Sequence, residues 1–373
     1  MRKHFRIAAG LLALVLCITA ALAAGGDAGD PLVSLSYLQD LFSKTVDTAA
    51  GSRMDSADTA LQDAARQRLD AMSSAVGAVA GQQYAPSLTE VTLKENDILT
   101  GATGLLVVPF TGDLQASFGS GAIIDVTAGT EIPSGTILTA NHRYIVAENT
   151  VAHFTVLSPT AVLSFQGKYA QTISGSTPDF FAISCALRNL GLFRGTGSGI
   201  GEGFDLHLAP TRAEGIVMFI RILGEESDAL SCEYTHPFRD VPGWLDRYVA
   251  WAYHQGYTNG VSATAFGTQQ TISAVEYQEF LLRALGYSVA GVHDYTTSLS
   301  RALECGAISS GEYDMLREVT FLRAHVAYIS YYSLDVMISG TGRTLSEHLR
   351  ALDIFTRSQL ASARALVNSP RVI

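Results

Sequence analysis

The chain has 373 residues, of which 47% are hydrophobic and 16% are charged, and its formal net charge is −10. This composition excludes a disordered chain, and the length accommodates two or three domains with separate cores. An acidic surface does not attract nucleic acid or an anionic membrane through bulk charge, so we expect no nucleic-acid partner. An anionic ligand would need a local cluster of Arg side chains or backbone N–H groups.

The first 24 residues have the pattern of a secretory signal peptide. The basic start MRKHFR is followed by an apolar run that ends in the small-residue pattern ALA at 21–23. We therefore predict a signal peptide over residues 1–24 and a secreted protein. The alternative is a retained membrane anchor, for which the apolar run is short. No second run of 18 or more apolar residues occurs, so we predict no transmembrane segment after cleavage.

Three cysteines follow this segment: Cys185, Cys232 and Cys305. Three thiols cannot all pair, and the number is too small for a disulfide scaffold. Their neighbours in sequence are mainly apolar or small. We therefore predict packed, unpaired thiols.

Residues 30–84 are predicted to be helical, because their apolar residues recur at steps of three and four. Gly51-Ser52 interrupts the pattern, which favours two helices joined by a turn over one long helix. From Ala65 to Val79 the spacing suits a coiled coil, but only over about two heptads, fewer than the three or four that are decisive. Packing within the domain is therefore favoured, and self-association stays open.

A β-rich domain is predicted over residues 85–168. Short β-branched runs such as GLLVVPFTG (104–112) and VAHFTVLS (151–158) alternate with Gly, Pro, Asn and Asp. This pattern is typical of a small all-β sandwich or roll. The polar stretch YAQTISGSTP (169–178) is predicted to be a linker into the next domain.

The C-terminal half contains a repeat. FDLHLAPTRAEGIVMFIRILG at 204–224 corresponds without a gap to FGTQQTISAVEYQEFLLRALG at 266–286. A fixed period of this size indicates a repeated supersecondary unit, here helix, glycine turn, loop and helix. The matching pairs are Phe204 and Phe266, Thr211 and Ser273, Glu214 and Glu276, Arg221 and Arg283, and Gly224 and Gly286.

Three copies of this unit are predicted. Copy one covers residues 179–230, copy two 231–290 and the degenerate copy three 291–350, and a C-terminal helix follows at 351–373. In copy one the first helix is expected at about 179–190 and the second from Thr211. In copy two, Asp240 is expected to cap the helix that contains Trp251. In copy three, Arg323 takes the place of Arg212 when FLRAH is aligned with PTRAE.

Thr211 and Glu214 have the spacing of a capping box at the start of a helix. Arg212 would then lie at a helix N-terminus, where free N–H groups and the positive end of the dipole favour an anion. A guanidinium there can grip a carboxylate at two points, which Lys cannot do. The alternative is that Thr211 and Glu214 only cap the helix, while Arg212 is solvated.

The repeats resemble S-layer homology (SLH) domains, whose units combine an F-x-D-V…WA…G-x-x-x-G half with an F-x-P…TRAE half. FRDV at 238–241 and WA at 251–252 represent the first half, and PTRAE at 210–214 represents the second. The resemblance covers about residues 179–350. It implies an all-α three-repeat module with a pseudo-threefold arrangement and grooves between the repeats. In that family the grooves hold secondary cell-wall polysaccharide, which is often anionic and pyruvylated, and fix secreted proteins to the Gram-positive wall.

The resemblance implies a set of polysaccharide-binding residues: Arg212, Thr211, Glu214, Asp240, Trp251 and Arg323. The sequence also departs from the family. Copy two keeps the capping pair but has Ala274 in place of the Arg, and copy three keeps the Arg but has lost both capping residues. The residues that keep the fold therefore persist better than those that would grip a ligand.

Enzyme interpretations find little support in the sequence. The nine His residues are scattered, without H-E-x-x-H or pairs at metal-ligand spacing, and no G-x-S-x-G elbow occurs. We therefore predict no catalytic residue, no metal site and no cofactor. The most polar group outside the repeats, Asn141-His142-Arg143-Tyr144, fits alternating strand residues better than a site.

Taken together, these features predict an α+β chain with a helical segment, a small all-β domain and an all-α three-repeat module. The predicted function is a non-catalytic protein at the cell wall or cell surface, which binds secondary cell-wall polysaccharide and displays its N-terminal domain. One alternative is a self-assembling structural protein whose repeats no longer bind polysaccharide. A second is an unrecognised enzyme or a sugar-binding β domain near His142.

Overall fold

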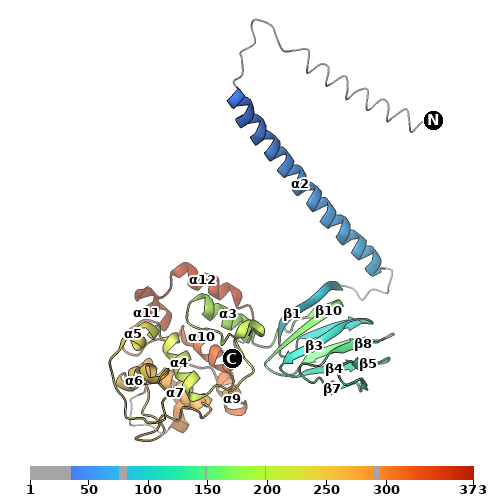
Figure 1. The fold of residues 1–373 in the computed structure, drawn as a ribbon. Helices are drawn as coiled ribbons and strands as arrows, with labels where there is room; N and C mark the ends of the chain where they lie inside the picture. Colours follow the sequence, from blue (N-terminus) through green and yellow to red (C-terminus); the bar gives the residue numbers. More distant parts are fainter. Residues whose placement is uncertain (1–34, 75–81, 148, 198, 289–294) are drawn as a thin grey trace, which may run out of the picture. The chain divides into compact units, whose positions relative to one another are not determined.

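The computed structural model describes residues 35–74, 82–147, 149–197, 199–288 and 295–373, with only the backbone course at 35–47 and 69–74. The chain divides into two units, Met1–Ala80 and Gly81–Ile373. The predicted signal peptide lies outside the described residues. The described part is mixed, as expected: a helix, then a nearly closed antiparallel sheet, then a series of helices (Figure 1).

The first unit contains one described helix, α2 (Leu35–Ser74), so the prediction of a turn at Gly51 is wrong. Glycine inside a helix costs only about 1 kcal/mol relative to alanine, which a long helix tolerates. The hydroxyls of Ser56 and Thr59 donate to backbone carbonyls four residues earlier, so these residues continue the helix. In the part with described side chains, Met54 and Leu61 are exposed.

The second unit begins with a ten-stranded antiparallel sheet. Its strands are β1 (Gln83–Lys94), β2 (Ile98–Ala102), β3 (Leu106–Thr111), β4 (Leu114–Phe118), β5 (Ile123–Asp125), β6 (Thr130–Ile132), β7 (Thr136–Ile137), β8 (Tyr144–Val146), β9 (Val151–Val156) and β10 (Thr160–Thr172). Neighbours follow the order β6-β5-β8-β3-β10-β2-β9-β4-β7, and β1 pairs with β10. The predicted all-β domain is thus present as one sheet.

The long strand β10 organises this sheet, because it pairs with β1, β2 and β3. Its last four residues, 169–172, pair with 98–101 of β2, and Tyr169 packs on Phe165 with ring centroids 4.4 Å apart. The predicted linker 169–178 therefore starts too early, and the predicted domain 85–168 is too short at both ends. Small polar residues here belong to a strand because the neighbouring strand supplies hydrogen bonds.

The helical part follows the sheet. Its α-helices are α3 (Phe180–Asn189), α4 (Arg212–Ile222), α5 (Glu226–Ser231), α6 (Asp246–His254), α7 (Ala274–Ala284), α8 (Ser298–Glu304), α9 (Ser310–Glu318), α10 (Arg323–Ser333), α11 (Leu345–Ala351) and α12 (Arg357–Leu366), with short 3₁₀ helices η1 (Gly201–Gly203) and η2 (Tyr295–Thr297). Within the ranges predicted for the three copies, α3, α6 and α8 take the place of the first helix, and α4, α7 and α10 take the place of the second. The predicted helices of copy one are confirmed. Capping boxes also start α11 at Thr344 and α12 at Thr356.

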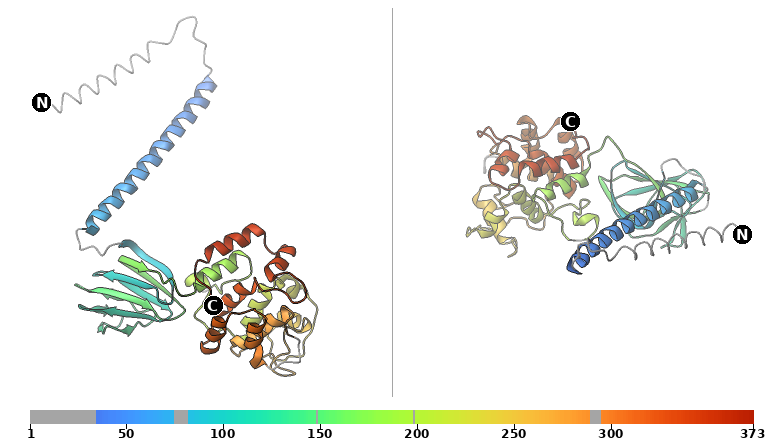
Figure 2. Two further views of the ribbon diagram at one scale, coloured as in Figure 1. Left: turned by 180° about the vertical axis from the view of Figure 1, so that it is seen from behind. Right: turned by 90° about the horizontal axis from the view of Figure 1, so that it is seen from above.

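The helices of the three copies pack in a closed order. Each second helix contacts the first helix of the following copy: α4 contacts α6, α7 contacts α8, and α10 contacts α3. The three second helices also contact one another. The C-terminal helix α12 lies beside α3, as the views of Figure 2 show. Copy three is thereby joined back to copy one.

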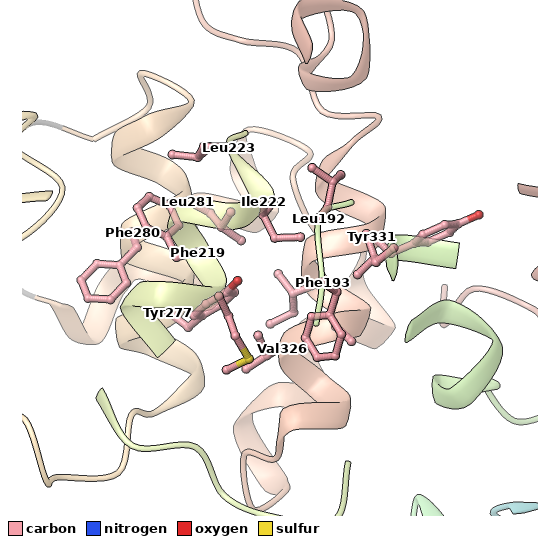
Figure 3. Packing of buried hydrophobic residues seen from close by; sticks show 14 of the residues in the cluster. Leu192, Phe193, Phe219, Ile222, Leu223, Tyr277, Phe280, Leu281, Val326 and Tyr331 are labelled. Carbon is pink, nitrogen blue, oxygen red and sulfur yellow. The ribbon is translucent and has the colours of Figure 1, made fainter. Parts of the chain in front are cut away.

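The core of the helical part is where the second helices meet. Phe219 from α4, Tyr277 and Leu281 from α7, and Val326 from α10 are buried there (Figure 3). Tyr328 and Tyr331 are buried as well. Because α4 and α10 are buried on nearly every side, their polar side chains need partners inside the protein, as Arg212 and Ser330 show.

The glycine that recurs in the repeat follows the second helix of copies one and two, α4 and α7. Gly224 follows α4 with φ of +71°, and Gly286 follows α7 with φ of +78°. This left-handed conformation is natural for glycine and strained for residues with a Cβ, which explains why this position recurs. Copy three lacks this glycine after its second helix α10. Copy three also has an additional helix, α9, before α10, where the other copies have a loop.

Copy one is also joined to the sheet. The N–H of Gly201 in η1 donates to Oε1 of Glu90 on β1 at 3.1 Å. After β10, Thr177 donates its hydroxyl to the carbonyl of Glu95 at 2.8 Å, and the N–H of Ser174 donates to Asp97 at 2.7 Å. The connection between the sheet and the helices is therefore fixed by hydrogen bonds at both ends.

Candidate functional site

The predicted capping box at the start of α4 is confirmed. The N–H of Glu214 donates to Oγ1 of Thr211 at 3.2 Å, and the N–H of Thr211 donates to Oε2 of Glu214 at 2.7 Å. Ser273 and Glu276 form the same box at the start of α7. Two backbone donors that a helix start would leave open are satisfied in each case.

Arg212 is buried at the first position of α4, with only 2% of its surface exposed. Its Nε donates to the carbonyl of Phe266 at 2.9 Å, and its Nη1 forms an ion pair with Oε1 of Glu276 at 2.7 Å. Its Nη2 donates to Oγ1 of Thr258 at 3.4 Å. The guanidinium therefore faces copy two, and the solvated alternative for Arg212 is wrong.

Aromatic rings complete the surroundings of this guanidinium. The rings of Phe266 and Phe280 each lie 5.2 Å from its central carbon. A cation against the face of an aromatic ring is attracted by the ring quadrupole. The loop that carries Phe266 is also bound by Asp240, so the Phe266 carbonyl that accepts from Arg212 is held in a fixed position.

Asp240 provides that second hold. Its carboxylate accepts the N–H groups of Phe266 and Gly267 at 2.7 Å each, and that of Thr268 at 3.2 Å. Although burial raises the pKa of Asp240, these hydrogen bonds lower it below its ordinary value. The prediction that Asp240 caps the following helix is wrong: α6 begins at Asp246, and Asp240 instead closes the loop before α7.

Arg323 repeats the contacts of Arg212 at the junction of copy three with copy one. Its Nε donates to the carbonyl of Phe204 at 2.9 Å, and its Nη1 lies 3.6 Å from Oε1 of Glu214. It is 4% exposed, and burial lowers its pKa. The predicted alignment of Arg323 with Arg212 is confirmed by these matching partners, Phe204 for Phe266 and Glu214 for Glu276.

The remaining junction, from copy two to copy three, lacks both charges. Ala274 occupies the position of the Arg, and His325 occupies the position of the Glu. His325 accepts the N–H of Leu322 at 2.9 Å through Nδ1, which replaces half of a capping box. A groove of about 410 Å³ lies beside this junction, lined by Ala274 and Phe321 among mainly apolar residues.

Trp251 lies apart from the Arg212 and Arg323 contacts. Its Nε1 donates to Oε2 of Glu225 at 2.7 Å, and the hydroxyl of Tyr257 donates to Oε1 of Glu225 at 2.9 Å. Burial raises the pKa of Glu225. Tyr234 stacks on His254 with a centroid distance of 3.5 Å next to this group. The six predicted site residues thus fall in three places, one of which is built around Glu225.

A second groove, of about 420 Å³, lies near the end of α4. We call it the Arg194 groove after the exposed side chain that lines it. Oε2 of Glu226 pairs with Arg194 at 2.9 Å, and Oε1 pairs with Arg221 at 2.8 Å. Burial raises the pKa of Glu226, but hydrogen bonds from Arg221 and Tyr248 outweigh it and lower the pKa overall.

The sequence interpretation missed several of these residues. Glu276 was visible as a repeat position, but its spacing from Ser273 suggested only a cap, and an ion pair over 64 positions leaves no local signal. Glu226 and Arg194 were not among the predicted site residues. Arg194 follows the glycine turn after the first helix of copy one, and the predicted unit of helix, glycine turn, loop and helix was the available signal.

In the β domain, His142 forms a pair with Asp125 at 2.7 Å through Nδ1. The same carboxylate accepts the N–H groups of Thr127 and Ala128, each at 3.0 Å. Burial raises the pKa of Asp125, while the hydrogen bond from His142 and the other contacts lower it overall. Asp125 thus closes the turn after β5, and His142 is held as part of that turn.

Two further observations concern the described residues only. Within the described ranges, no group of three or more His, Cys, Asp or Glu side chains has a geometry that could hold a metal ion. Among the described helices, none combines the length and the apolar character that crossing a membrane requires. The three described cysteines are free thiols, as predicted.

In comparisons with known proteins, no family model matches this chain, and a search of curated proteins finds no match.

Proposed function

We propose that residues 179–350 form an SLH-type module that attaches this protein, after export, to an anionic cell-wall polysaccharide. The observation that carries the proposal is the repeated arginine contact. Arg212 binds the Phe carbonyl and the capping Glu of the next copy, and Arg323 binds the same two groups one copy further on. A pseudo-threefold arrangement of three repeats calls for such equivalent contacts, and the closed packing order of the helices supports it.

The Arg194 groove is the proposed place for the polymer. It brings two guanidinium groups to one surface, and the Arg194 side chain is 60% exposed. Arg suits carboxylate and phosphate groups because its planar fork binds them at two points. Glu226 forms ion pairs with both Arg194 and Arg221. In this proposal, an anionic sugar replaces Glu226 as the partner of the exposed Arg194, while the ion pair between Glu226 and Arg221 remains.

In this proposal, Arg212 and Arg323 hold the module together and do not touch the polymer. Both side chains are nearly fully buried, and each contacts the next copy. The β domain is the part displayed at the surface, and we assign no catalytic role to the chain.

A second candidate function is a structural protein at the cell surface whose repeats bind no polysaccharide. The specific observation in its favour is the burial of Arg212 and Arg323, which leaves the family-type arginines engaged within the protein. Self-association would then involve α2, on which Met54 and Leu61 are exposed by 74% and 69%. A molecular mass by sedimentation well above that of a monomer, without wall binding, would favour this candidate.

Co-sedimentation with purified Gram-positive wall sacculi tests the main proposal. The wild-type protein is expected in the pellet, and Arg194→Ala is expected mainly in the supernatant. Arg317→Ala is the matched control, because Arg317 is a similarly exposed arginine on α9, away from the groove. If the wild type stays in the supernatant, anchoring is wrong; if both variants bind alike, the assignment of the Arg194 groove is wrong.

Arg212→Ala separates stability from binding. We expect this variant to lose wall binding only in proportion to its loss of folded protein, which a thermal melt of the same sample measures. Loss of binding by a fully folded Arg212→Ala protein would instead place Arg212 in the ligand site.

A further inference from the structure

A pocket of about 480 Å³ lies where two turns of the β domain meet the helical copies. Asp113 and Ser158 line it from the sheet, His207 lines it from copy one, and Thr320 and His325 line it from copy three. Pockets of this size at the boundary of two structural parts are common binding sites for small molecules. This pocket is separate from the Arg194 groove.

His325 is the most constrained polar side chain of the pocket. Only 2% of its surface is exposed, and its ring lies against Phe321 and edge-on to Phe180, with centroid distances of 6.0 and 5.5 Å. Nδ1 accepts the N–H of Leu322 at 2.9 Å, so in the neutral ring the proton is on Nε2. No hydrogen bond to Nε2 is formed by the residues that the structure describes. Because Nε2 is not one of the fully enclosed polar atoms that lack a partner, solvent reaches it, and a ligand oxygen in the pocket could accept from it instead.

The pocket is without positive charge at neutral pH. Burial lowers the pKa of His325 to about 4 and lowers that of His207 as well, so both rings are neutral. The lining contains no Lys or Arg, and the carboxylate of Asp113 lies at its exposed side. An anionic ligand would meet a negative charge without a cation to offset it, so the chemistry favours a neutral ligand.

On the side of the pocket formed by the sheet, hydrogen-bond acceptors lie on a turn that contains Asp113 and Ser158. The hydroxyl of Ser158 donates to the carbonyl of Thr160 at 2.8 Å and accepts the N–H of Asp113 at 2.9 Å. These two bonds fix the backbone of the turn. The Asp113 carboxylate itself forms no ion pair or hydrogen bond with the described residues, so it is available to accept from ligand hydroxyl groups.

We propose that this pocket, the His325 pocket, binds a small neutral polyhydroxy compound such as a single sugar unit. One ligand oxygen accepts from Nε2–H of His325, and neighbouring hydroxyl groups donate to the Asp113 carboxylate. The apolar parts of Leu157, Pro159 and Val319 cover the less polar face of the ligand. This site goes beyond the proposed wall attachment, since it takes a monomer, lies at the sheet and requires no arginine.

The test observes His325 directly in the intact protein. Long-range proton–nitrogen spectra of protein labelled with ¹⁵N-histidine resolve Nε2 of each ring, and His325→Phe identifies the signal. N-acetylglucosamine and glucose are the probes, glycerol is the small polyol, and inorganic phosphate is the anionic comparison. We expect a saturable shift of the His325 signal with at least one sugar, with a Kd on the order of 1 mM, and none with phosphate. Absence of a saturable shift with every sugar and with glycerol, or a larger shift with phosphate, overturns the proposal.

A second variant keeps the test independent of folding around His325. Asp113→Ala changes an exposed side chain without described partners and is expected to weaken sugar binding about tenfold, the effect of losing a charge-assisted hydrogen bond. Asp228→Ala, another exposed aspartate, is the matched control and is expected to bind as the wild type does. Equal affinity of the two variants would overturn the assigned contact. Wall sacculi should bind both variants alike, so failure here is distinguishable from failure of the wall proposal.

Discussion

Copy one packs on copy two through charged residues, whereas copy two packs on copy three through neutral residues at the corresponding positions. At the first of these junctions, Arg212 reaches across to Glu276 and to the carbonyl of Phe266. At the second, the corresponding positions are Ala274 and His325, and Phe321 and its apolar neighbours line the boundary. The third junction, with Arg323 and Glu214, resembles the first.

The comparison suggests that such a junction is stable either with both charges or with neither. Removing one partner of a buried ion pair leaves an uncompensated charge, which costs about 3–5 kcal/mol, whereas replacing both by neutral groups of suitable shape is often neutral or stabilising. Ala274 and His325 follow this rule. At this boundary both positions are neutral, Ala274 on α7 and His325 on α10, so neither leaves a buried charge without a partner.

The largest expected effect comes from Arg212→Ala. This change leaves Glu276 without its cation and the carbonyl of Phe266 without its donor, so the free energy of unfolding should fall by about 4 kcal/mol. Urea denaturation measures it. Arg317→Ala, on the surface of α9, should change stability by less than about 0.5 kcal/mol. A loss for Arg212→Ala no larger than that of this control would contradict the structural role of the pair.

Phe321→Ala tests the neutral junction and should cost slightly less. The Phe321 ring is 7% exposed and packs against Tyr277 and His325. Its removal should lower the free energy of unfolding by about 3 kcal/mol, the lower end for a buried aromatic ring. Because the junction is apolar, this loss should not depend on salt. The measurement is denaturation at low and high ionic strength, and a salt-dependent loss would show that charges contribute after all.

Acid should act on the neutral junction through His325. Burial lowers its folded pKa to about 4, below the ordinary value of 6.5, so the unfolded chain binds the extra proton between these values. The contribution of His325 to stability is therefore complete above pH 6.5 and is lost as pH falls towards 4, by up to about 3 kcal/mol. Denaturation across this range should show a smaller slope for His325→Phe than for the wild type. Equal slopes would mean that His325 titrates normally.

Rebuilding the missing pair should give the smallest effect. In a double-mutant cycle, Ala274→Arg and His325→Glu should each destabilise alone, and together they should show a favourable coupling of about 1–2 kcal/mol. The groove beside Ala274 provides room for the longer side chain. Thermal and urea denaturation of the four proteins give the coupling. A coupling near zero would indicate that the second junction differs from the first in backbone geometry as well as in chemistry.

Local patterns predicted much of the fold. The helix start at Thr211 follows from its capping box, because both members of the box lie within four residues. The β domain follows from alternating short runs. The single helix α2 was missed because Gly51 lowers helix propensity without deciding the outcome.

The site was harder to predict because its contacts are not local. Arg212 and Glu276 are 64 positions apart, and Asp240 holds a loop 26 to 28 positions away. Sequence spacing identified Arg212 as a special residue at a helix start but suggested that it points outward. Only the packing of copy against copy turns the side chain inward, where burial and an ion pair replace exposure and a ligand.

The bond from Arg323 to the carbonyl of Phe204 joins residues 119 positions apart. A chain that leaves the ribosome or an export channel from its N-terminus cannot make this contact until copy three has emerged. Until then, the carbonyl of Phe204 lacks this donor and Glu214 has only its capping contact with Thr211. Incompletely packed segments of this kind are the ones that chaperones bind. Assembly of the three copies is expected to be a late, concerted event, whereas the sheet, complete at Thr172, can form first.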